Sequence, residues 1–125
     1  MPINLAQETR QAIASSYKKP EDIIFIGSVG ISEPSYACTW DEFLEIANYD
    51  YVPDGTVPAV AHDLIVAFAD GSWLERGGED FTERWEFRGP LHLPQDTRKL
   101  EKVFAENGGF ETVHEIYVST KVQRS

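Results

Sequence analysis

The residue types that most often carry out chemistry are few in this chain and stand far apart. The histidines His62, His92 and His114 lack the spacing of metal ligands, and neither His-Glu-x-x-His nor Cys-x-x-Cys occurs. His62 precedes Asp63 directly, so the pair could act as a base and its orienting group. We favour the plainer interpretation of a loop histidine before a strand, and we predict no metal site.

Cys38 is the only cysteine, and it lies just before a predicted helix, whose N-terminus would stabilise a thiolate. No base stands near it in the sequence, and a buried structural cysteine is the commoner case. A single cysteine forms no intramolecular disulfide, which agrees with a reducing cytoplasm. We therefore expect a cytoplasmic protein with a structural thiol.

Two short loops resemble ligand-binding motifs but fail at their key positions. The segment DYVPDG, residues 50–55, begins like a calcium loop, yet its third position is Val52 and its twelfth is Ala61 instead of glutamate. The segment 27–30, GSVG, lacks the Lys-Ser/Thr ending of a phosphate-binding loop. We interpret both as turns and predict no cofactor.

Three glutamates, Glu75, Glu83 and Glu86, lie near one another on a predicted meander, where two carboxylates could act as acid and base. The register that we predict sets Glu75 opposite Arg84 and Arg76 opposite Glu83, which favours structural ion pairs. We therefore propose no catalytic residue and expect that the chain is not an enzyme.

The hydrophobic pattern predicts the elements that must position these residues. Helices are expected at about 4–17, 40–47 and 97–107, the second starting at a Thr39/Glu42 capping box. Strands are expected at 23–26, where Gly27 ends the strand, at 35–38, in a meander at about 63–88, and at 112–122. Residues 49–60 are expected to form a long loop. This order predicts an α+β fold with a mainly antiparallel sheet and two to three flanking helices.

The meander predicts which side chains share a face of the sheet. Asp70-Gly71 is typical of a two-residue hairpin turn, which would set Phe68 opposite Trp73. The two faces would then carry Trp85, Leu74 and Ala67 on one side and Trp73, Phe68 and Val66 on the other. Helices can cover one face, and the other would need the long loop, a second subunit or a partner.

Length and composition are those of one globular domain, residues 1–125, with 42% hydrophobic residues. The N-terminus shows no basic stretch followed by an apolar run, so no secretory signal is expected. The longest apolar run, 64–69, is too short to cross a bilayer, and we expect no membrane association.

The net charge of −10 is concentrated in one part of the chain. Residues 20–75 contain eleven acids and no lysine or arginine, whereas acids and bases nearly balance in the rest. Such a block repels nucleic acid and anionic membranes and attracts basic partners. Direct nucleic-acid binding is therefore not expected.

Aromatic residues set among these acids are typical of interface anchors. The candidate binding residues are the acids Asp41, Glu42, Glu45, Asp50, Asp54 and Glu75, with Tyr49, Tyr51 and Trp73 as anchors. For Tyr49 and Tyr51 a core position remains as open as a surface one, whereas Trp40 is assigned to the core.

The segments TWDEFLEIANYDY and HDLIVAFADGSWLERGGEDFTERWEF together resemble small accessory proteins encoded by phages and prophages. The resemblance covers roughly residues 39–88 and includes a Trp-Leu-Glu-Arg strand followed by a Trp-Glu-aromatic strand. It implies a protein of a mobile element and leaves the activity open.

Three functions remain as hypotheses. The first is a non-enzymatic acidic protein that binds the basic face of a host protein or nucleoprotein complex and inhibits it, as anti-restriction and anti-CRISPR proteins do. The second is a small-molecule-binding or enzymatic domain with a site between the sheet and the 49–62 loop. The third is a homodimer that pairs its uncovered sheet face.

Overall fold

The computed structural model describes residues 2–53, 59–77, 83–89, 93–105 and 111–123. Helices in this part of the chain are α1 (Leu5–Ser15), α2 (Trp40–Ile46), α3 (Val113–Gln123) and a short 3-10 helix at Pro20–Asp22. The strands are β1 (Ile3–Asn4), β2 (Ile23–Ser28), β3 (Tyr36–Cys38), β4 (Asp50–Tyr51), β5 (Leu64–Phe68), β6 (Trp73–Gly77), β7 (Arg84–Arg88) and β8 (Arg98–Lys99). The chain is an α+β protein, as its sequence predicts.

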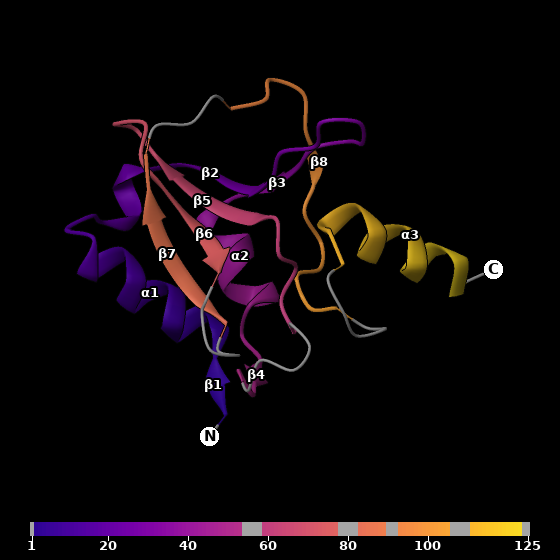
Figure 1. Ribbon diagram of the computed structural model, residues 1–125, viewed down its shortest axis with the longest axis horizontal. Helices are drawn as coiled ribbons and strands as arrows, with labels where there is room; N and C mark the ends of the chain where they lie inside the picture. The colour runs from indigo at the N-terminus through magenta and orange to yellow at the C-terminus, as the bar shows by residue number, and fades with distance from the viewer. Residues whose placement is uncertain (1, 54–58, 78–82, 90–92, 106–110, 124–125) are drawn as a thin grey trace.

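One mixed sheet dominates the fold, with strand order β7-β6-β5-β2-β3-β8. Its neighbouring strands are antiparallel except β3 and β8, which are parallel. The predicted meander is confirmed as β5, β6 and β7. Figure 1 shows α1 beside β7 and α3 beyond β8. Strands β1 and β4 form a separate antiparallel pair, and β4 lies in the segment that the sequence predicted to be a loop.

The N-terminal half follows its local sequence signals closely. Asn4 caps α1 by accepting a hydrogen bond from the backbone of Gln7. The predicted capping box of α2 is confirmed, because Thr39 and Glu42 each bond to the other's backbone N–H. Gly27, however, does not end β2. A Cβ at this position would lie 1.8 Å from the carbonyl oxygen of Tyr36, so glycine is what lets β3 approach β2.

Helices α1 and α2 cover one face of the sheet. The buried layer between these helices and the sheet includes Val66, Phe68, Leu74 and Trp85 from the sheet and Leu5, Ile13 and Phe43 from the helices. Trp85 is a core residue, and its indole Nε1 donates a hydrogen bond of 2.9 Å to the Thr9 hydroxyl on α1. This bond satisfies the polar group of the indole inside an apolar layer.

The opposite face carries a smaller buried cluster of Phe25, Ile65 and Ala67. Trp73 and Leu93 pack against it, and Leu93 belongs to the connection between β7 and β8, the two edge strands of the sheet. We expected this face to be covered by the long loop, a second subunit or a partner. Part of the cover comes instead from the connection between β7 and β8.

The first hairpin differs by one residue from the predicted register. Trp73 lies opposite Ala67 instead of Phe68. The backbone N–H of Phe68 donates to the carbonyl of Ser72, so the turn holds three residues instead of two. The Asp70 carboxylate accepts hydrogen bonds from the backbone N–H and hydroxyl of Ser72, and this side chain stabilises the longer turn.

A shift of one residue moves side chains to the other face of a sheet. Val66 and Phe68 therefore pack in the helix-covered layer with Trp85. Ala67 lies with Trp73 in the opposite cluster. The prediction of faces was wrong for these residues of β5 and right for Trp73 and Trp85.

The second hairpin is shifted by two residues, which preserves the faces. Glu75 lies opposite Glu86, so the predicted pairing of Glu75 with Arg84 was wrong. The predicted ion pair between Arg76 and Glu83 does form, at 3.3 Å, although the two residues are not directly opposite. Long side chains can reach along the strand, and the charges meet without the predicted register.

The helix predicted at 97–107 does not form in the described residues 97–105. The segment is extended, because its backbone bonds to segments that are distant in the sequence: the N–H of Leu100 donates to Ala37 at 2.6 Å, and the carbonyl of Val103 accepts from Ala61 at 2.7 Å. Leu100 and Val103 are buried in the main core. Tertiary burial thus outweighs a helical spacing of apolar residues.

The strand predicted at 112–122 is instead the helix α3. Thr112 and Glu115 form a second capping box, with the Glu115 amide bonded to the Thr112 hydroxyl at 3.2 Å. Val113 and Ile116, three residues apart, are the buried positions, which is the spacing of a helix. The alternating apolar residues masked this signal.

Candidate functional site

The candidate acids of α2 fall on two neighbouring rows of the helix. Asp41 and Glu45 are exposed and one turn apart, so they share a face. Glu42 is engaged, since its carboxylate accepts from the Thr39 backbone at 2.9 Å and pairs with Lys99 at 3.2 Å. The Thr39 hydrogen bond, followed by Lys99, holds the pKa of Glu42 below its ordinary value. Asp41 and Glu45 face solvent, whereas Glu42 caps the N-terminus of the helix.

Tyr49 and Asp50 extend this surface beyond the end of α2. Tyr49 is 69% exposed, and its ring centroid lies 5.5 Å from that of Phe104. Asp50 is exposed on β4 and accepts a 3.4 Å hydrogen bond from the Asn4 side chain. The structure therefore places Tyr49 at the surface, one of the two positions that the sequence left open.

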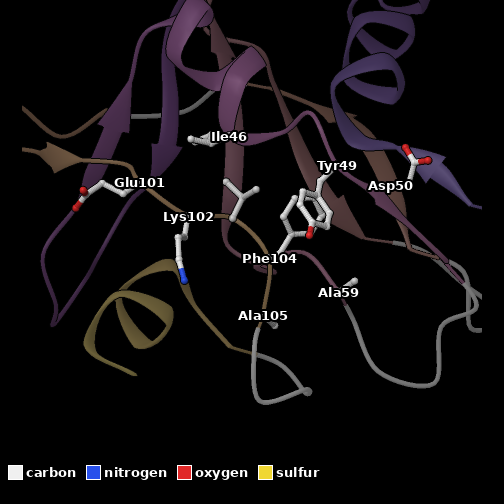
Figure 2. Close-up of a pocket in the computed structure, with 9 residues that line it drawn as sticks. Ile46, Tyr49, Asp50, Ala59, Glu101, Lys102, Phe104 and Ala105 are labelled. Carbon is white, nitrogen blue, oxygen red and sulfur yellow. The ribbon is translucent and has the colours of Figure 1, made fainter. Parts of the chain in front are cut away.

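A pocket of about 500 Å³ adjoins this surface. It is lined by Ile46, Tyr49, Asp50, Ala59, Glu101, Lys102, Val103, Phe104 and Ala105. Figure 2 shows the rings of Tyr49 and Phe104 side by side at its centre, with the carboxylates of Glu101 and Asp50 toward opposite ends. Its volume falls within the ~300–1,000 Å³ of typical ligand sites.

The pocket lies between two segments that are distant in the sequence. Backbone hydrogen bonds join them, because Ala105 donates to Ala59 at 2.7 Å and Phe104 forms a bridge with Val60. The pocket is formed by the end of α2, by residues 49, 50 and 59 and by residues 101–105. The sequence predicted a site between the sheet and the 49–62 loop, but no strand of the six-stranded sheet contributes a lining residue. Phe104 was not predicted as a site residue, because its segment was expected to be a helix.

Tyr51 is buried, at 6% exposure, so it does not lie on the surface with Tyr49. The expectation that Tyr51 anchors a partner is corrected by its contacts. Its hydroxyl donates to Glu8 on α1 and accepts from Arg76 Nη2 at 2.9 Å. Burial raises the pKa of the Tyr51 hydroxyl. Tyr51 is therefore a core residue with a satisfied polar group.

Arg76 is the centre of this buried polar network. Its guanidinium pairs with Glu8 and with Glu83, both at 3.3 Å, and lies 4.9 Å from the Trp85 ring centroid. Glu83 also accepts the backbone N–H of Ala59 at 2.8 Å. The network thus ties α1, β4, β6 and the start of the 59–62 segment together. We interpret it as structural, because its charged groups are directed at one another.

Trp73 and Glu75 lie apart from the α2 surface. Both are on β6 and point to the sheet face that α2 does not cover, where Trp73 is half-buried against Leu93. Glu75 pairs with Arg88 at 3.0 Å. Of the remaining candidates, Asp54 lies outside the described residues. The structure therefore brings together Asp41, Glu42, Glu45, Tyr49 and Asp50 and separates them from the pair on β6.

Each of the three clustered glutamates is paired with an arginine. Arg88 contacts both Glu75 and Glu86 at 3.0 Å, and Arg84 lies 3.5 Å from Glu86, so these arginines offset the repulsion between two carboxylates that lie directly opposite each other. Glu83 belongs to the Arg76 network. These contacts are the structural ion pairs that we favoured over an acid–base pair, although the partner of Glu75 is Arg88.

In the His62-Asp63 dipeptide, Asp63 has a structural role. The Asp63 carboxylate accepts the backbone N–H of Val113 at 2.9 Å and so helps to cap α3, while His62 is exposed. Burial raises the pKa of Asp63. His114 bonds through Nδ1 to the hydroxyl of Tyr36 at 2.7 Å, a contact that the predicted strand concealed. Tyr36 is fully buried, so this pair is a core contact.

The described residues contain no group of three or more His, Cys, Asp or Glu placed to hold a metal ion. No described helix combines the length and apolar character needed to span a membrane. Comparison with protein-family models, curated proteins and solved structures found no match to this chain.

Proposed function

We propose that the chain is a non-enzymatic binding protein of a phage or mobile element, which docks on a basic surface of a host nucleic-acid-handling or defence complex and inhibits it. The observation that carries this proposal is the group of exposed acids Asp41, Glu45 and Asp50 beside the exposed ring of Tyr49. Surface carboxylates imitate phosphate charges and accelerate association with basic partners. An exposed tyrosine supplies apolar contact at low entropic cost.

The charge distribution supports the proposal. Both α2 and β4 lie within residues 20–75, which contain no lysine or arginine. Lys99, from outside this block, pairs with Glu42. Asp41 and Glu45 lie on the neighbouring row of α2 and face solvent. The phage origin is supported by the resemblance of segments 39–51 and 62–87.

The test is a pull-down from bacterial lysate with the tagged protein at low and high salt, followed by mass spectrometry. We expect a nucleic-acid-binding protein to be retained at low salt, released at high salt and displaced by duplex DNA, because the carboxylates occupy its phosphate sites. Glu45→Lys/Asp50→Lys should lower this retention by about tenfold or more. Asp41 is left in place because a carboxylate in the first turn also stabilises the helix.

Glu21→Lys/Asp96→Lys is the matched control, since both acids are exposed and the change in net charge is the same. This control should retain the partner as the unmodified protein does. Equal retention by both double variants would mean that net charge, and not the α2 surface, is responsible. Retention of no macromolecule at low salt would contradict the proposed function itself.

A further inference from the structure

We propose that the pocket beside Tyr49 receives an apolar or aromatic side chain from a lysine- or arginine-rich segment of the partner. This inference rests on the proposed function and specifies the chemistry of the segment that docks. The pocket and the acidic surface are continuous, because Tyr49 and Asp50 belong to both and Ile46 lies on the same helix as Glu45.

The walls of the pocket select an apolar group. Tyr49 and Phe104 place two aromatic rings against each other with centroids 5.5 Å apart, and Ile46 adds an aliphatic side chain to the lining from the end of α2. Ala59 and Ala105 add small apolar side chains, which leave the space open. An aromatic or aliphatic side chain of a partner would exclude water here and contact both rings.

The charges around the pocket select the residues that flank this group. Asp50 and Glu101 place carboxylates toward opposite ends of the pocket, and Lys102 contributes one ammonium group. Glu45 adds a further exposed carboxylate on the adjoining helix. The local balance is therefore negative, which favours lysine or arginine on both sides of the inserted side chain.

Two other candidate surfaces among the described residues are closed or already occupied. The Arg76 network is buried and directs its charges inward. Trp73, on the opposite face of the sheet, packs with Leu93 of the same chain. The pocket is where an exposed aromatic ring, open volume and carboxylates coincide.

Two synthetic peptides of equal charge test the inference, one with four lysines around a phenylalanine and one with glycine in its place. Fluorescence anisotropy at low salt should show that the phenylalanine peptide binds at least tenfold more tightly. Tyr49→Ala, which removes a wall, and Ala105→Phe, which fills the space, should each abolish this preference. Glu45→Lys/Asp50→Lys should weaken both peptides and leave their ratio unchanged.

Tyr17→Ala is the matched control, because Tyr17 is 97% exposed and lies after α1, away from the pocket-lining segments. It should bind both peptides as the unmodified protein does, and thermal unfolding should show that each variant is folded. Equal affinity for the two peptides, binding of neither, or a preference that survives both pocket variants would overturn the inference.

A small organic molecule found in the pocket by native mass spectrometry of the purified protein, and displaced by neither peptide, would also overturn the inference. The proposed function is judged separately, by salt-dependent retention of a partner in the pull-down. If the Glu45/Asp50 variant loses that partner while the two peptides bind equally, the proposed function is supported. The inference that the pocket beside Tyr49 receives an apolar side chain is then wrong.

Discussion

At Cys38, the chemistry of a single residue is set by competing surroundings. The thiol precedes the N-terminus of α2, which favours the thiolate, but it is partly buried. Burial, followed by the carboxylate of Glu42, raises the pKa of Cys38 to about 12, while Lys99 acts in the opposite direction. The thiol therefore stays protonated at neutral pH.

We predict that Cys38 reacts slowly with thiol reagents in the folded protein. At pH 8 the labelling rate should be at least ~10-fold lower than in urea, because each unit of raised pKa lowers the thiolate fraction tenfold. Time-resolved labelling with a chromogenic disulfide measures both rates. Equal rates in the folded and unfolded protein would show that the site is open and the thiol ordinary.

Glu42 makes stability depend on pH. Its pKa is lower in the folded protein than in the unfolded chain, so its contribution is present above the ordinary carboxylate pKa of about 4.3 and is lost as pH falls below it. Glu42→Gln should be less stable at pH 7, and the difference should shrink toward pH 3. Urea unfolding across this range tests the prediction, and a constant difference would contradict it.

Among the elements, α3 shows how a short motif and an apolar pattern can disagree. Thr112 and Glu115 form a capping box of the same type as Thr39 and Glu42. The capping box of Thr112 and Glu115 was not predicted, because the apolar residues that follow it alternate, a pattern typical of a strand. The backbone bond from Val113 to Asp63 then anchors the helix to the rest of the molecule.

We predict that Thr112→Ala destabilises α3 by about 1 kcal/mol, the usual cost of losing an N-cap side chain. Hydrogen exchange of the amides at 113–117 should accelerate accordingly, by roughly fivefold. Thr97→Ala serves as the control, because Thr97 is exposed and precedes β8. Similar exchange in the two variants would mean that the capping bond contributes nothing measurable.

In the whole molecule, the Arg76 network connects elements that do not otherwise share a sheet. Arg76→Ala would leave the carboxylates of Glu8 and Glu83 buried without their countercharge. We predict a loss of about 3–5 kcal/mol, the usual cost of breaking a buried ion pair from one side. Urea unfolding monitored by tryptophan fluorescence measures it.

The triple variant Arg76→Met/Glu8→Gln/Glu83→Gln should recover much of that loss, since no unpaired charge remains. Recovery would separate a charge effect from the loss of contacts with Trp85 and Tyr51. If Arg76→Ala proved as stable as the unmodified protein, the network would not be what joins α1 to the sheet.

Local sequence was sufficient wherever the decisive interactions lie within a few residues of one another. The helices α1 and α2, the capping box at Thr39 and the three strands of the meander were predicted because periodicity and caps are local. The acids Asp41 and Glu45 were predicted as surface candidates from the charge of residues 20–75, and both are exposed on α2. The α+β class follows from the same elements.

The tertiary structure alone decided what depends on distant segments. It buried Tyr51 against Glu8 and Arg76, and it brought Phe104 to Tyr49 to form the pocket. It also made residues 98–105 extended, because their backbone groups find partners in β3 and in residues 59–61. Spacing along the chain does not encode such contacts, since their free energy comes from burial and hydrogen bonds that exist only once both segments are in place.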